Sequence, residues 1–179
     1  MSIELDILRD VSDRLDHAGI PFMVTGSMAM NAYAQPRMTR DIDIVIEVKA
    51  IDAARLLAAF RSDYYIDDGA VDRAIRNESL FNVIHQEWVF KVDLIVRKHT
   101  PYRALEFERR QRLQIGDYHT WVVSKEDLIL SKLCWGLDSQ SEYQARDIRN
   151  LLNTTCDRDY IQEWAVNLGV MDYLRSIEK

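Results

Sequence analysis

The stretches Phe22-Met-Val-Thr-Gly-Ser-Met-Ala-Met30 and Asp41-Ile-Asp-Ile-Val-Ile46 decide the fold of this chain. The first begins as a short apolar strand, residues 22–25, which a Gly-Ser turn joins to a helix over residues 28–34. Pro36 follows and cannot continue that helix. The second stretch is rich in β-branched residues, which is typical of a central strand. Together they predict strand, tight turn, helix and strand in that order.

Outside this unit, hydrophobic spacing predicts further helices and strands. Helices are expected over residues 3–19, 51–60, 71–76 and 104–112, and strands over residues 64–67, 80–85, 90–96 and 120–123. From Ser124 onward only helices are expected, at 126–137, 144–152 and 159–168. The sequence therefore predicts an α/β (α+β) fold in which helices flank a mixed β-sheet. We expect a core of residues 1–123 and a helical C-terminal extension of residues 124–179 that packs on the core.

Composition narrows the class of protein. The 179 residues are 47% hydrophobic, enough for a sizeable core. With 23 Lys and Arg against 29 Asp and Glu, the net charge of −6 excludes the broad basic surface of a non-specific nucleic-acid binder. The N-terminus lacks a basic start followed by an apolar stretch, and no run is long enough to span a membrane. We expect a cytoplasmic protein without membrane association, with Cys134 and Cys156 as reduced thiols.

Three carboxylates stand on predicted strands. Because strand side chains alternate with a period of two, Asp41 and Asp43 project from one face of their strand. Asp93 lies within another strand, Lys91-Val-Asp-Leu-Ile95, and a neighbouring sheet position would bring it alongside the pair. Such close carboxylates repel each other, and oxygen ligands of this kind suit Mg²⁺, or Mn²⁺, bound together with substrate phosphates. We predict Asp41, Asp43 and Asp93 as metal ligands and catalytic residues.

The Gly26-Ser27 turn precedes a helix, where glycine lets a phosphate approach the backbone and the amides and the hydroxyl can donate to it. Taken singly, each feature has an ordinary structural explanation. An Asp-Ile-Asp strand occurs by chance in many proteins, and a Gly-Ser turn is a common connection between two elements. Their ordered combination, with a third carboxylate on a later strand, favours nucleotidyl transfer.

At this point the sequence resembles a known family. Val24-Thr-Gly-Ser-Met-Ala-Met30, Tyr33 and Pro36-Arg-Met-Thr-Arg-Asp-Ile-Asp43 are similar to the signature of the DNA polymerase β-like nucleotidyltransferase superfamily. The resemblance is to its small bacterial branch, which includes stand-alone nucleotidyltransferases, aminoglycoside and lincosamide adenylyltransferases, and AbiE-type nucleotidyltransferase toxins. It implies that Gly26 and Ser27 bind a triphosphate, that Asp41 and Asp43 ligate metal, and that Asp93 completes the triad as a base. Arg37 and Thr39 match the run that precedes the acidic pair, and are predicted to bind nucleotide.

The helical tail resembles the AbiE-type group, in which a helix lysine and a following Arg-Asp pair contribute to the nucleotide site. Lys132, Arg146 and Asp147 are the matching residues. Two alternatives stay open: Lys132 snorkels from an apolar helix, and Arg146-Asp147 is only a surface ion pair. A basic cluster, Arg103, Arg109, Arg110 and Arg112, is either a solvated helix face or a surface that holds an acceptor. Core packing explains the tryptophans, Trp88, Trp121, Trp135 and Trp164, better than base stacking.

The function predicted from these residues is a metal-dependent transferase. It moves a nucleoside monophosphate from an NTP to an unidentified acceptor, which is RNA, protein or a small molecule, and releases pyrophosphate. One alternative is a catalytically silent binding module with the same fold. Another is a toxin-antitoxin component whose partner is an antitoxin.

Overall fold

The computed structural model describes residues 2–34, 41–139 and 141–179. Its helices are α1 (Ile3–His17), α2 (Gly26–Tyr33), the 3₁₀ helix η1 (Ala50–Asp52), α3 (Ala53–Phe60), α4 (Asp68–Asn77), α5 (Pro101–Glu108), α6 (Lys125–Ser139), α7 (Glu142–Leu152), α8 (Arg158–Asn167) and α9 (Met171–Ile177). Its strands are β1 (Phe22–Thr25), β2 (Ile42–Ile46), β3 (Tyr64–Tyr65), β4 (Leu80–His85), β5 (Phe90–Val96), β6 (Gln111–Ile115) and β7 (Tyr118–Val122).

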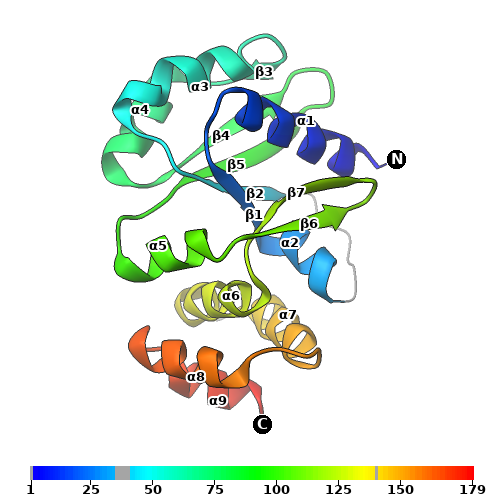
Figure 1. Cartoon of the computed structure of the whole chain (residues 1–179), viewed down its shortest axis with the longest axis vertical. Coiled ribbons are helices and arrows are strands. Elements are labelled where there is room, and N and C mark those ends of the chain that lie inside the picture. The colour runs from blue at the N-terminus through cyan, green and yellow to red at the C-terminus, as the bar shows by residue number, and fades with distance from the viewer. Residues whose placement is uncertain (1, 35–40, 140) are drawn as a thin grey trace.

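Within these residues, seven strands form one mixed sheet in the order β3-β4-β5-β2-β1-β7-β6. β2 runs parallel to β5, and β1 runs parallel to β7, whereas the other neighbouring pairs are antiparallel. The first two strands of the chain, β1 and β2, therefore lie at the centre (Figure 1). The predicted mixed sheet with flanking helices is confirmed.

The central strands have one face in the core and one face turned toward the predicted site. Ile42, Ile44 and Ile46 of β2 are all fully buried, while Asp43 and Val45 between them are only partly buried. This alternation follows from the period of two in a strand. The register of the sheet is therefore fixed by the isoleucines, because a slip of one residue would place the carboxylate in the core.

The helices cover the sheet in two groups. α1, α3 and α4 lie toward one end of the molecule, and α6 to α9 gather at the opposite end (Figure 1). α6 packs against α2, α7 and α8, so the helical tail reaches the central unit through α2. The Tyr33 hydroxyl reinforces this contact by donating to the Val123 carbonyl at 2.8 Å. The buried apolar residues of the described chain form one continuous cluster that includes both the sheet and these helices.

Two predictions about elements were wrong. The helix expected over residues 104–112 ends at Glu108, and residues 111–122 form the hairpin β6–β7, of which only the second strand was expected. The hairpin turns at Gly116-Asp117, with Gly116 at φ +64°, a conformation suited to glycine. A two-residue turn of this kind between alternating polar and apolar residues is a hairpin signal. The other error is α9, a short helix after Gly169 that was not predicted.

A membrane span would need a longer or more apolar helix than any found within the described ranges.

Candidate active site

The sheet register brings two of the predicted carboxylates together. Asp43 on β2 and Asp93 on β5 are direct partners in the parallel pair, so both side chains leave the same face of the sheet from neighbouring strands. Burial raises the pKa of the Asp43 carboxyl, and the charges of Asp93 and Asp41 raise it further. The mutual repulsion that the sequence suggested is thus present in the structure.

Asp41 stands immediately before β2 and is exposed. It is close enough for its charge to act on both Asp43 and Lys91, so it belongs to the same electrostatic cluster. It takes part in further contacts within the molecule. Arg37 and Thr39, predicted to bind nucleotide, lie outside the described residues.

Gly26 fits against the carboxylate of Asp43. Thr25 pairs with Asp43 across the antiparallel β1–β2 ladder, and the chain then turns at Gly26 with φ +62°. A Cβ placed on Gly26 would lie 2.1 Å from Asp43 Oδ2, which is a severe overlap. Glycine is therefore required here for two reasons, the left-handed backbone and the space taken by the carboxylate.

Gly26 also begins α2, which places Ser27 in the first turn of that helix. The amides and the partial positive charge at a helix N-terminus favour anions. Met28, Ala29 and Met30 are buried and hold α2 against the core, so this end of the helix has a fixed position beside Asp43. The arrangement can hold a phosphate group next to the carboxylates.

Lys132 on α6 reaches the same region. A cavity of about 150 Å³ is lined by Gly26, Asp43, Lys132 and Gln144, among others. The Lys132 ammonium donates to Asp147 Oδ2 at 2.9 Å and to Gln144 Oε1 at 3.1 Å, both on α7. Lys132 is only 4% exposed, so it does not snorkel to solvent. It also lies near enough to Asp43 to favour that residue's charged form.

Asp147 is buried and pairs with Lys132, so it is not part of a surface ion pair with Arg146. It is 1% exposed and pairs with Lys132, and it makes further contacts. Arg146 instead lies over the ring of Tyr143, with 5.5 Å between the guanidinium carbon and the ring centroid. A buried lysine needs such a partner because an isolated ammonium is costly to bury.

Sequence reasoning missed two residues that contact Asp93. The Lys91 ammonium donates to Asp93 Oδ2 at 3.0 Å, and Asn82 Nδ2 donates to Asp93 Oδ1 at 2.5 Å. Lys91 could have been found, because it precedes Asp93 by two residues and so shares its face of β5. Asn82 could not, because its position opposite Asp93 depends on the β4–β5 register.

The donor set fits a hard divalent cation. Among the described residues no three potential ligands are already arranged around a metal position. In this structure the Lys91 ammonium is the cation that contacts Asp93, and that side chain is 45% exposed. A half-exposed ion pair of this kind is weak and easily exchanged. Three mutually repelling carboxylates with oxygen donors only are the chemistry that Mg²⁺ or Mn²⁺ accepts.

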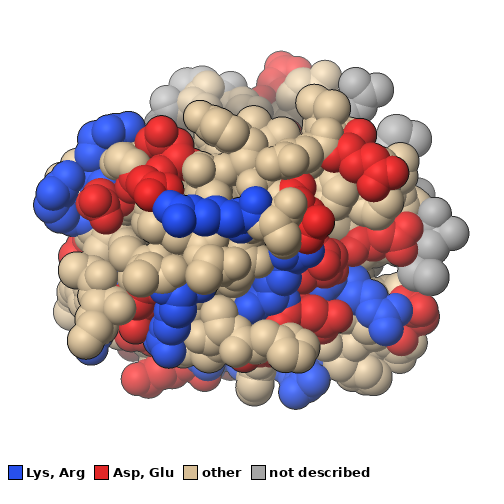
Figure 2. All heavy atoms as spheres, turned by 90° about the horizontal axis from the view of Figure 1, so that it is seen from above, with Lys and Arg blue, Asp and Glu red and all other residues tan. Residues whose placement is uncertain are grey.

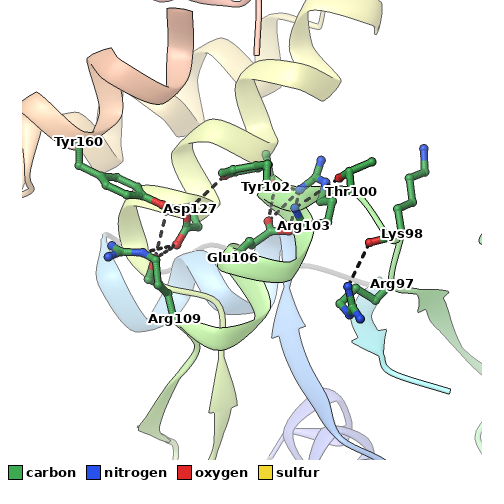
Figure 3. Close-up of polar contacts among 11 residues, drawn as sticks. Arg97, Lys98, Thr100, Tyr102, Arg103, Glu106, Arg109, Asp127 and Tyr160 are labelled. Atoms are coloured by element: carbon green, nitrogen blue, oxygen red, sulfur yellow. Dashed lines mark hydrogen bonds and ion pairs between the residues drawn. The ribbon is translucent and has the colours of Figure 1, made fainter. Parts of the chain in front are cut away.

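The predicted basic cluster is neither a single helix face nor fully solvated. Arg109 Nε donates to Asp127 Oδ2 at 2.9 Å, and Arg103 holds Glu106 through two contacts of 2.8 Å (Figure 3). Asp127 is fully buried and also accepts from the Tyr102 and Tyr160 hydroxyls, so it ties α5 and α8 to α6. The other two members, Arg110 and Arg112, lie over the ring of Trp121 on the β6–β7 hairpin.

Core packing accounts for only some of the tryptophans. Trp164 packs on Tyr102 with 4.9 Å between ring centroids, but Trp135 is 57% exposed and Trp88 is 43% exposed. The C-terminal end of α6 is therefore not buried. There Trp135 lines two cavities.

The surface charge agrees with the composition. Figure 2 shows one face of the molecule, on which Lys and Arg side chains are interspersed with Asp and Glu. This face offers no broad basic area for nucleic acid.

Solved structures define the class of fold. The chain is similar to the lincosamide antibiotic adenylyltransferase LnuA bound to lincomycin, with 17% identity, a TM-score of 0.59, and coverage of 87% of this chain and 98% of that one. It is similar to ANT(2'')-Ia in complex with adenylyl-2''-tobramycin, with 10% identity, a TM-score of 0.67, and coverage of 93% and 97%. An antigenic nucleotidyltransferase-like protein from Paracoccidioides brasiliensis gives 18% identity, a TM-score of 0.61, and coverage of 98% and 92%.

These likenesses show that the chain has the nucleotidyltransferase fold. No family model matches the sequence, and no curated protein matches it significantly.

Proposed function

We propose that this protein is a metal-dependent nucleotidyltransferase that moves a nucleoside monophosphate from an NTP to an acceptor hydroxyl or phosphate and releases pyrophosphate. The observation that carries the proposal is the meeting of Asp43, Asp93 and the Gly26-Ser27 turn on one face of the sheet. Carboxylates beside an anion-binding helix N-terminus suit phosphoryl chemistry. The fold, shared with known adenylyltransferases, agrees with this chemistry.

In the proposed mechanism the chain positions both reactants. The amides of Gly26 and Ser27 hold phosphate oxygens of the donor, and Lys132, which lines the same cavity, adds a positive charge. The acceptor oxygen forms a bond to the α-phosphorus while the bond between the α-phosphorus and the bridging oxygen to the β-phosphate breaks. Pyrophosphate leaves with that electron pair, and Asp93 takes the acceptor's proton when a hydroxyl attacks.

Asp41, Asp43 and Asp93 would hold the Mg²⁺ or Mn²⁺, which supplies stabilisation of the charge that develops on the phosphate oxygens. Lys91 must then give up its contact with Asp93, and its exposed ammonium is free to do so at small cost. Arg37 and Thr39 remain predicted nucleotide ligands. We place the activity in the cytoplasm, where NTP is available.

The direct test is to incubate the purified protein with each α-labelled NTP, Mg²⁺ or Mn²⁺ and a total cell extract. The proposal expects label on one class of acceptor only when a divalent cation is present. Label that stays entirely in the NTP under every condition, while the protein binds NTP, would favour the silent binding module instead.

Assignment to the AbiE-type branch, with an antitoxin partner, is a narrower proposal that rests on Lys132 and Asp147 lying beside the candidate site. Expression of the protein alone should then stop growth, and Asp43→Asn should abolish that effect. Normal growth with active enzyme present would separate this chain from the toxins without affecting the proposed chemistry.

A further inference from the structure

A second and larger cavity adjoins the candidate active site. It has a volume of about 580 Å³, within the range of small-molecule sites. It shares four lining residues with the smaller cavity that contains Asp43 and Lys132, namely Thr25, Ile95, Ser131 and Trp135. A molecule bound in it would therefore lie next to the carboxylates. Nothing in the proposed mechanism uses this space.

The charged residues that line this cavity are mostly cationic. Within the described residues, they are Arg97, Lys98 and Arg103 against the single carboxylate Glu106. Glu106 is already satisfied, because Arg103 donates to both of its oxygens at 2.8 Å and the Ser131 hydroxyl donates at 2.5 Å. The negative charge of Glu106 is thus balanced by Arg103, so it does not act on a ligand in the cavity.

Of the two remaining cations, Lys98 has a charge that is not paired with a described carboxylate. Arg97 pairs with Glu47 at 2.7 Å, yet its Nε is buried without an acceptor among the described residues. The Lys98 side chain extends away from Arg97 (Figure 3). Its ammonium makes no hydrogen bond or ion pair with the described residues, whereas its carbonyl accepts from Arg97 Nη1. An anion entering this cavity would meet a free ammonium and no uncompensated carboxylate.

The rest of the lining favours a flat apolar group. Val45, Ile95 and Val96 supply aliphatic surface, and Trp135 is 57% exposed at the boundary of the two cavities. An exposed indole of this kind is a stacking platform for planar rings. The cavity therefore combines a ring-binding surface with a site for negative charge.

We propose that this cavity is the acceptor site and that it selects an acceptor carrying a phosphate or carboxylate together with a planar ring, and rejects polycations. The proposal rests on the proposed nucleotidyl transfer and names its acceptor class. It separates this chain from the ANT(2'')-Ia complex, which holds adenylylated tobramycin, because the protonated amines of tobramycin would face Lys98 and Arg97. Like charges brought together in this way suppress binding.

The test uses 1-naphthyl phosphate as the probe, titrated by calorimetry into the full chain saturated with Mg²⁺ and α,β-methylene-ATP. The analogue keeps the donor site filled, so the probe reports on the second cavity. We expect binding of 1-naphthyl phosphate, at least about tenfold weaker binding of 1-naphthol, which lacks the charge, and no measurable binding of tobramycin.

Two variants locate the binding. Lys98→Glu should weaken the binding of 1-naphthyl phosphate by at least about tenfold. Trp135→Ala should weaken the binding of 1-naphthyl phosphate more than the binding of inorganic phosphate. The matched control Lys179→Glu makes the same charge change at the exposed C-terminus and should have no effect. Affinity for α,β-methylene-ATP should stay within about twofold in Lys98→Glu.

Equal binding of the probe to wild type and Lys98→Glu, or tighter binding of tobramycin, would overturn the assignment. Mutually exclusive binding of the probe and α,β-methylene-ATP would also overturn it, because the cavity would then belong to the donor. Label transfer to a polycationic acceptor would refute the acceptor class while leaving the proposed function intact. Conversely, if the wild-type protein transfers no NMP but binds 1-naphthyl phosphate, 1-naphthol and tobramycin as expected, the proposed function is refuted and the preference of the cavity is not.

Discussion

At Gly26 the backbone has φ +62°, and a Cβ there would lie 2.1 Å from Asp43 Oδ2. Gly26→Ala should therefore strain the turn and displace the carboxylate. We expect a loss of about 1–2 kcal/mol in the free energy of unfolding from the left-handed backbone alone, with additional loss from the clash, measured by urea denaturation. Affinity for Mg-ATP should fall as well, because Asp43 can no longer keep its place.

The matched control is Gly69→Ala in α4, where φ is ordinary and the nearest atom to a new Cβ is Arg73 Nη1 at 3.1 Å, the end of a flexible side chain. That variant should keep or gain stability, since alanine is the better helix former. A Gly26→Ala protein as stable and as tightly binding as Gly69→Ala would contradict the account of the turn.

At the residue scale, the roles of Asp41, Asp43, Asp93 and Gly26 remain predictions. The period of two in a strand suggested Asp41 and Asp43, and the turn before a helix suggested Gly26. The partners of Asp93 did not follow, because Asn82 reaches it only through the register of β4 against β5. The position of Asp93 beside Asp43 also needed the order of the sheet, in which β5 and not β4 neighbours β2.

At the scale of elements, the ion pair of Lys132 and Asp147 joins α6 to α7 beside the candidate site. Both side chains are at most 5% exposed. Asp147→Asn leaves a buried ammonium without its counter-charge, so we expect the free energy of unfolding to fall by about 3–5 kcal/mol. Urea denaturation at several pH values measures this loss.

The control is Arg61→Gln, which removes the ion pair with Asp68 where both side chains are more than half exposed. Its effect should be about 1 kcal/mol or less. If Asp147→Asn costs no more than Arg61→Gln at any pH, the pair does not hold the two helices together.

Element-level prediction was strongest for long periodic segments such as α1, β5 and α6. It was wrong for residues 109–115, where the local sequence suggests a helix but pairing with a distant strand decides the structure. The charged residues before Gln111 led to a predicted helix that continues to residue 112. In the structure the helix ends at Glu108, because residues 111–115 pair with β7. Exposure of Trp135 could not be predicted either, since it depends on which elements surround α6, not on the helix itself.

At the scale of the whole molecule, the division into a core of residues 1–123 and an extension of residues 124–179 remains a prediction. The buried cluster runs through both parts, and Asp127 of α6 accepts hydrogen bonds from Tyr102 and Arg109. We therefore expect a chain ending at residue 123 to lose cooperative unfolding and to expose apolar surface, measured by circular dichroism and dye binding. A cooperative transition in that fragment would show that the core folds by itself.

The central claim is that the Asp41, Asp43 and Asp93 cluster transfers a nucleoside monophosphate, and Asp93→Asn tests it most directly. The substitution keeps the shape and removes the charge, so folding and NTP binding should persist. Transfer of α-label to the acceptor, and release of γ-label as pyrophosphate, should both fall by at least about 100-fold, the lower range for a lost general base. Calorimetry with NTP and the two labels are measured on the same preparation. Transfer undiminished in Asp93→Asn would remove Asp93 from the mechanism and contradict the account.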